Sequence, residues 1–74
     1  MSETKAHLGA EFNLSRDEVA LLDLIANGRT RKEIAEIRGV SVGTIQRMTR
    51  VIEAKVGART TEQAIAKVAR AGIL

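Results

Sequence analysis

The sequence has no cysteine, no proline, one histidine and one aromatic residue among its 74 positions. Without cysteine the chain can form no disulfide, and a single histidine (His7) cannot complete a zinc site, so we expect neither a metal nor a cofactor. The shortage of aromatic residues, with only Phe12, argues against a β-sandwich or a small β-barrel. Stability must then come from helix packing, which a partner chain can complete.

The composition is otherwise that of an ordinary globular protein, with 45% hydrophobic and 28% charged residues. A chain of this length has room for one domain. The residues that dominate it are mostly compatible with helix, so the predicted fold class is all-α. A formal net charge of +3 and a pI of about 10.0 suit an anionic partner. No uncharged stretch can span a bilayer and no basic-then-apolar leader opens the chain, so we expect a cytoplasmic protein that does not contact a membrane.

Helix starts are indicated by three capping boxes, in which a hydroxyl residue is followed three positions later by Glu or Gln. The boxes are Ser15 with Glu18, Thr30 with Glu33, and Thr60 with Gln63. Ser41 can cap one further helix, and a glycine follows each apolar run as a terminator. The predicted helices are 16–26, 31–38, 42–56 and 61–71. Residues 1–13 show no sustained period and are predicted to be a flexible arm, with Leu8 and Phe12 packing back on a domain of residues 14–74.

The second and third predicted helices are joined by the short turn Arg38-Gly39-Val40-Ser41. Two helices joined by a three- or four-residue turn with a glycine form a helix-turn-helix, although a generic helical hairpin looks similar. We expect Gly39 to supply a positive φ and Val40 to pack into the core at the corner. Ile34, Ala35 and Ile37 are expected to face inward. The predicted architecture is a compact four-helix domain with a central helix-turn-helix.

The sequence resembles the LuxR-type (GerE-like) DNA-binding domain over residues 14–74. The matching positions are Leu14-Ser15, Glu18, Leu21-Leu22, Ile25-Ala26, Gly28, Lys32-Glu33-Ile34-Ala35, Val40-Ser41, Thr44-Ile45, Lys55-Val56-Gly57 and Ala64-Ile65. The resemblance implies a four-helix fold whose third helix enters the DNA major groove and whose fourth commonly forms a two-fold dimer contact. Region four of sigma factors shares part of the pattern, but it usually continues into a basic tail, whereas residues 60–74 here predict another capped helix.

This sequence departs from the family pattern at three places. Gln46 and Met48 stand where members usually carry a basic residue and often a His, and Val56 replaces a Leu. Most members also attach this domain to a receiver or ligand-sensing domain, so this chain resembles the small stand-alone members.

The third helix is predicted to divide into an inner and an outer face. Ile45, Met48, Ile52 and Val56 recur at helical spacing and should face the core. The predicted base-reading residues on the other side are Val42, Gly43, Gln46, Arg47 and Arg50. Gln can pair with adenine and Arg with guanine in the major groove, and Gly43 permits a close approach to the DNA. The predicted phosphate contacts are Thr30, Arg31, Lys32, Thr44 and Arg59.

The fourth helix carries the predicted dimer contact. Its members are Ala64, Val68 and Ala71, while Ile65 and Ala69 are assigned to the core. Together these features predict a bacterial, nucleoid-associated transcription regulator that binds double-stranded DNA as a homodimer.

The alternative is a protein-interaction module that pairs with a larger LuxR-type regulator or docks on RNA polymerase. The loss of a basic residue at Gln46 favours that alternative, and Arg47 with Arg50 weighs against it. Catalysis is not expected, because His7 has no partner residue and the glycines do not form a phosphate-binding loop.

Overall fold

The computed structural model describes residues 12–74, which form four α-helices and no strand. The helices are α2 (Arg16–Ala26), α3 (Arg31–Arg38), α4 (Val42–Val56) and α5 (Thr61–Arg70). The predicted all-α fold and the bounds of the first three helices are confirmed. The last helix ends one residue earlier than predicted, because Ala71 is its C-cap. Of the predicted arm, residues 1–11 lie outside the described part, including His7 and Leu8, while Phe12 packs against the core.

Each helix begins at a hydroxyl residue that accepts a backbone N–H three positions later. The boxes at Ser15 and Thr30 are complete, since Glu18 and Glu33 each accept the N–H of their cap residue at 2.8 Å. The third predicted capping box, Thr60 with Gln63, forms only one of its two expected hydrogen bonds. The Gln63 side chain accepts the N–H of Arg59 at 2.8 Å and not that of Thr60.

Both ends of α4 adjoin a glycine in the left-handed region. Gly39 (φ 69°) ends α3 and opens the turn into α4, and Gly57 (φ 70°) ends α4. A side chain with a Cβ rarely adopts this conformation, so glycine is the residue that lets the chain reverse within a few residues. The predicted role of Gly39 is confirmed. These two turns set where α4 starts and stops.

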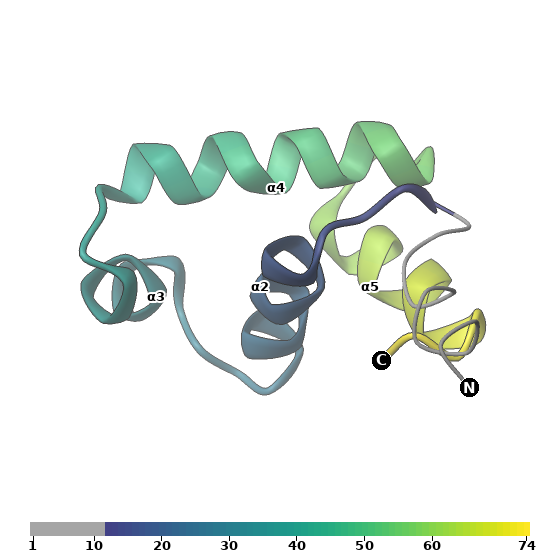
Figure 1. The fold of residues 1–74 in the computed structure, drawn as a ribbon, viewed down its shortest axis with the longest axis horizontal. Helices are drawn as coiled ribbons and strands as arrows, with labels where there is room; N and C mark the ends of the chain where they lie inside the picture. The colour runs from purple at the N-terminus through teal and green to yellow at the C-terminus, as the bar shows by residue number, and fades with distance from the viewer. Residues whose placement is uncertain (1–11) are drawn as a thin grey trace.

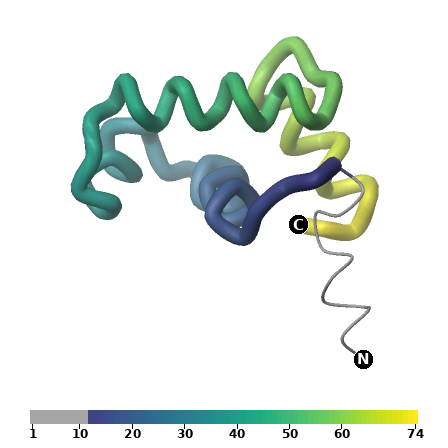
Figure 2. The backbone as a smooth tube through the Cα atoms, turned by 45° about the horizontal axis from the view of Figure 1, so that its top comes forward, coloured from purple at the N-terminus to yellow at the C-terminus, as the bar shows by residue number. Residues whose placement is uncertain are grey.

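The longest helix, α4, spans one side of the molecule, and α3, α2 and α5 lie beneath it (Figures 1 and 2). It packs most extensively against α3 and α5. The residues of the buried core come from all four helices and from the segment before α2, namely Leu14, Leu21, Leu22, Ile34, Ala35, Ile45, Ile52, Val56, Ala64 and Val68. One face of α4 therefore closes the core, and the other faces away from the protein.

Two predicted core residues near the turn are exposed. Ile37 is 62% exposed and Val40 is 40% exposed, so their inward assignment is wrong. At about 100° per residue, the buried face of α3 is set by Ile34 and Ala35, and Ile37 lies to one side of it. Val40 uses its backbone to close the turn, because its N–H donates to Ala35 O at 3.0 Å while its side chain points outward.

Candidate nucleic-acid interface

The inner face of α4 is apolar with one exception. Ile45, Ile52 and Val56 are buried as predicted, and Met48 is half-buried. Thr49, which the sequence did not mark as core, is also buried. Its hydroxyl donates to the Gln46 carbonyl at 2.7 Å, so this polar group is satisfied within the helix.

The outer face of α4 carries all five predicted base-reading residues. Val42, Gly43, Gln46, Arg47 and Arg50 are exposed. From Gly43 onward they occupy neighbouring positions one turn apart, so the helix presents them as one stripe. The Arg47 guanidinium donates to Thr44 Oγ1 at 3.2 Å, which holds it over the first turns of the helix. The structure thus brings together the side chains that the sequence predicted.

Neither the backbone conformation nor the neighbours of Gly43 within the described residues require a glycine there. Unlike the glycines that end helices, it lies inside α4 without a positive φ. A Cβ at this position would meet only Ser41 Oγ, at 3.7 Å, which is an ordinary contact. Glycine in a helix interior costs about 1 kcal/mol relative to alanine, which is an upper bound for Gly43 in the first turn of α4. The contacts of the described residues do not require glycine at this position.

The carboxylate of α4 is turned away from the outer stripe. Glu53 accepts the Thr61 hydroxyl at 2.9 Å, and Thr61 in turn accepts the Arg31 guanidinium at 2.8 Å. On the opposite side of α4, Lys55 pairs with Glu18 of α2 at 2.9 Å. The outer stripe itself has no acidic member, so its potential is set by Arg47 and Arg50.

Two glutamates at helix starts have a lowered pKa. Burial alone would raise the pKa of Glu18, but its hydrogen bonds with Lys55 and Ser15 outweigh burial and lower the pKa below its ordinary value of 4.5. The N–H and then the hydroxyl of Thr30 lower the pKa of Glu33. Both carboxylates therefore act as ionised helix caps, which leaves them no role as proton donors near neutral pH.

The predicted phosphate contacts lie on separate segments. Thr30 caps α3 with its hydroxyl, and Lys32 is exposed in the first turn of that helix. Arg31 is turned inward by its bond to Thr61, so only its remaining N–H groups are available. Thr44 is half-buried in the first turn of α4, whereas Arg59 lies beyond the other end of that helix. The structure does not gather these five residues at one point.

The predicted dimer stripe on α5 is wrong at two of its three positions. Ala64 and Val68 have no exposed surface, because with Thr61 they form the face of α5 that enters the core. Ala71 is half-buried. Of the two residues assigned to the core, Ile65 is half-buried and packs against it, whereas Ala69 is exposed, so its core assignment is wrong. The helix is rotated relative to the predicted phase.

The sequence model for bacterial regulatory proteins of the luxR family matches residues 12–68, most of the chain. The chain belongs to this family. No curated protein and no solved structure gave a match. The luxR family is one of DNA-binding regulators and not of enzymes, and α3 with α4 is its helix-turn-helix.

Within the part of this luxR-family chain that the structure describes, no helix is long and apolar enough to cross a membrane. Nor do the side chains of residues 12–74 bring together three or more potential metal ligands of the His, Cys, Asp or Glu type.

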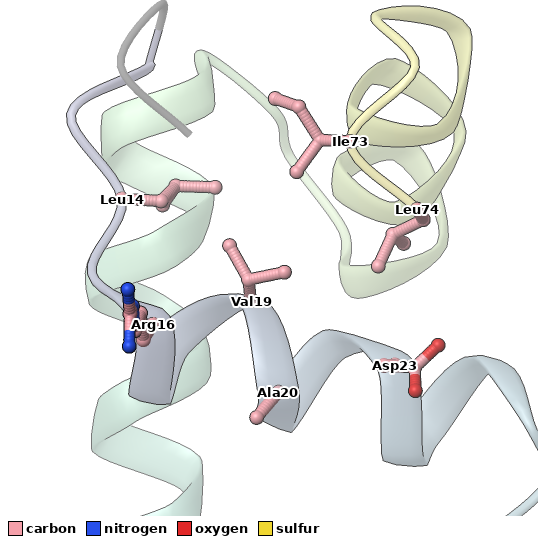
Figure 3. A pocket seen from close by; sticks show the side chains of 7 residues that line it. All are labelled: Leu14, Arg16, Val19, Ala20, Asp23, Ile73 and Leu74. Atoms are coloured by element: carbon pink, nitrogen blue, oxygen red, sulfur yellow. The ribbon is translucent and has the colours of Figure 1, made fainter. Parts of the chain in front are cut away.

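Two surface grooves are lined by residues other than the predicted base-reading residues. The larger, of about 550 Å³, is formed by α2 and the C-terminal residues, and Figure 3 shows Leu14, Val19 and Ile73 pointing into it. The smaller, of about 380 Å³, runs from the end of α4 along α5, and its lining residues are Gly57, Arg59, Gln63, Ala66, Lys67 and Arg70. Sequence reasoning assigned no site role to Lys67 or Arg70. Their spacing of three residues on one helix was a signal that could have found them.

Proposed function

We propose that this domain binds a specific DNA sequence and regulates transcription, with α4 in the major groove. The observation that carries the proposal is the outer stripe of α4, which is exposed, cationic and free of carboxylates. A helix fits the major groove of B-DNA, and arginine and glutamine match its hydrogen-bonding edges. The membership of the luxR family supports the same function.

Each member of the stripe has a role that suits its chemistry. Gln46 is assigned to an adenine, and Arg47 and Arg50 to guanines, because these pairs form two hydrogen bonds each. Val42 is 38% exposed at the start of α4 and is suited to a thymine methyl group. Gly43 lets the first turn of the helix approach the DNA closely.

Contacts to the phosphates position the domain on the duplex. We assign them to Lys32 and Arg59, whose side chains are exposed, and to the Thr30 and Thr44 hydroxyls at helix starts. Arg31 keeps a part in this role through the guanidinium N–H groups that Thr61 does not occupy.

We further propose that the domain binds as a homodimer, assembled on DNA, in the bacterial cytoplasm. The dimer contact moves from the buried Ala64 and Val68 to the flank of α5 that carries the exposed Ala69 and the part of Ile65 that does not pack against the core. This flank is small, so the dimer is weak in free solution and the DNA stabilises it by mass action. Half-sites about 10 base pairs apart would place both recognition helices on one side of the duplex.

Selection of bound fragments from genomic DNA, followed by a footprint and by ultracentrifugation with the selected duplex, tests this function. We expect two inverted half-sites and a dimer on DNA. Arg47→Ala should relax the sequence preference at the base that Arg47 reads, whereas Arg16→Gln on α2 removes the same charge and should leave the preference unchanged. A chain that selects no DNA but co-purifies with RNA polymerase or a larger LuxR-type regulator would show that the interaction module is the correct function.

A further inference from the structure

The smaller groove gathers positive charge with no acidic lining residue. Three of its six lining residues are cations, Arg59, Lys67 and Arg70, and none is Asp or Glu. Within residues 12–74, no carboxylate lies within 4.0 Å of any of the three. Like charges that share one groove repel each other, and a bound anion would relieve that repulsion.

The groove is also built to hold hydrogen-bond donors in place. Lys67 Nζ donates to Gly57 O at 2.9 Å and to Val56 O at 3.4 Å, which fixes the ammonium group at the end of α4 and leaves one N–H. Gln63 accepts the Arg59 N–H through its carbonyl oxygen, so its NH₂ group remains available. No described residue accepts a hydrogen bond from the Arg59 or Arg70 guanidinium within the geometric limits of such a bond.

The groove continues the surface that is proposed to bind DNA. Ala54 and Gly57 are exposed and follow Arg50 by four and seven residues, so they extend the outer stripe to the end of α4. From there the chain leads directly into α5 (Figure 1). A ligand lying along the outer stripe therefore meets the groove at the C-terminal end of α4.

The length of α4 indicates which part of the DNA would reach the groove. A helix of 15 residues is about 22 Å long, whereas the major groove is about 12 Å wide. Recognition helices contact bases mainly through their N-terminal residues. The C-terminal end of α4 then passes the edge of the major groove, where the sugar-phosphate backbone lies.

We propose that the groove of Arg59, Gln63, Lys67 and Arg70 binds the phosphates of the DNA strand that borders the major groove occupied by α4. This inference rests on the proposed function and extends it, since it adds Gln63, Lys67 and Arg70 to the interface and lengthens the contacted DNA beyond the bases that α4 reads. The ligand class is the phosphodiester backbone of duplex DNA, bound without regard to sequence.

The salt dependence of DNA binding tests this proposal. Affinity of the full chain is measured by fluorescence anisotropy over a series of salt concentrations, on a mixed-sequence duplex of about 30 base pairs, for wild type, Arg70→Gln and Arg59→Gln/Arg70→Gln. Each lost phosphate contact lowers the slope of log affinity against log salt by about 0.9, so we expect losses of about 0.9 and 1.8. Arg16→Gln on α2 is the matched control, because it removes one exposed charge outside the groove.

Two outcomes overturn the proposal. One is an unchanged slope in Arg70→Gln, since Arg59 is already assigned to a phosphate, and the other is an equal loss of slope in Arg16→Gln, which would show a general effect of net charge. If wild type binds DNA and Arg47→Ala relaxes its sequence preference while Arg70→Gln matches wild type, only the groove assignment fails. If wild type binds no duplex at all, the proposed function fails and the groove assignment fails with it. Far-ultraviolet circular dichroism of each variant checks that it is folded.

Discussion

The inner and outer faces of α4 differ in nearly every property except their spacing. Ile45, Thr49, Ile52 and Val56 recur every three or four residues and are buried, whereas Gln46, Arg47 and Arg50 recur at similar intervals and are exposed. The inner residues pack inside the folded chain, and their burial explains why they occupy these positions. Of the outer residues only Arg47 forms a side-chain hydrogen bond within the described residues, to Thr44 Oγ1 on the same exposed surface, and this contact does not bury it. One helix therefore separates stability from binding, and substitutions can test how complete that separation is.

The largest effect on folding is expected from a charge placed on the buried face of α5. Val68 has no exposed surface, so Val68→Glu would bury a carboxylate without a partner, which costs several kcal/mol. For so small a domain we expect an unfolded chain. Circular dichroism is the measurement, with Ala69→Glu at the exposed neighbouring position as the control, which should stay folded. A folded Val68→Glu protein that has lost only its dimer would show that Val68 belongs to an interface and not to the core.

The inner face of α4 should be the next most sensitive. Ile45→Ala and Ile52→Ala each remove a fully buried side chain, and we expect each to lower the free energy of unfolding by about 2–5 kcal/mol. Arg47→Ala on the outer face should change it by less than about 0.5 kcal/mol. Denaturant titrations measure all three. Similar losses for Ile52 and Arg47 would contradict the division of α4 into two faces.

DNA affinity should depend on the outer face of α4, whose substitutions are expected to change stability little. We expect Arg47→Ala and Arg50→Ala each to weaken binding to the selected site by about 1–3 kcal/mol, since each removes a two-bond contact to a base. Gln46→Ala should relax the preference at one base pair. Titrations against the selected duplex and against single-base variants of it measure these changes. Equal affinity of wild type and both arginine variants would remove α4 from the interface.

A substitution at Gly43 should raise the stability of the domain and lower its affinity for DNA. Gly43→Ala should raise the free energy of unfolding by up to about 1 kcal/mol, because alanine favours helix and its Cβ meets only Ser41 Oγ at 3.7 Å. The same methyl group should weaken DNA binding, since it enlarges the surface that approaches the DNA. Thermal melts and duplex titrations on one preparation measure both. A variant that is more stable and binds equally well would show that no close approach occurs at Gly43.

The smallest effect concerns the Lys55–Glu18 pair, which lies beside the inner face. Hydrogen bonds lower the pKa of Glu18 below 4.5, so its contribution to stability is present above about pH 4.5 and is lost as the pH falls through the folded-state pKa. Lys55→Met should cost about 1 kcal/mol or less at pH 7 and should reduce the acid sensitivity. Melting temperatures at pH 7 and at about pH 3 give the comparison. Identical pH profiles for wild type and Lys55→Met would show that the pair contributes nothing.

Local signals predicted the helices well, because caps and glycine terminators act within a few residues. Ser15, Thr30, Ser41 and Thr60 fixed the helix starts, and Gly39 and Gly57 fixed two ends. The stripe on α4 was also predictable, since that helix is long enough for its apolar period to define both faces.

Burial on the short helices was harder to predict. The phase of α5 and the exposure of Ile37 depend on where neighbouring helices lie, and eight to ten residues hold too few apolar positions to decide between two phases. The bonds of Lys67 to the carbonyls that end α4, and the inward turn of Arg31, link residues far apart in the sequence. No local pattern marks such links, although the three-residue spacing of Lys67 and Arg70 does place both cations on one side of α5.

The link from Arg31 through Thr61 to Glu53 also bears on how the domain behaves as ionic strength changes. Arg31 begins α3, Thr61 begins α5 and Glu53 lies in α4, so one part-buried hydroxyl joins three helices by bonds of 2.8 and 2.9 Å. Because the hydroxyl is neutral and partly shielded from solvent, dissolved ions weaken this junction much less than they weaken contacts between exposed charges and phosphates. We therefore expect the angle between α3 and α4 to change little at salt concentrations that weaken contacts between exposed charges and phosphates. Dissociation and rebinding would then require no rearrangement of the protein.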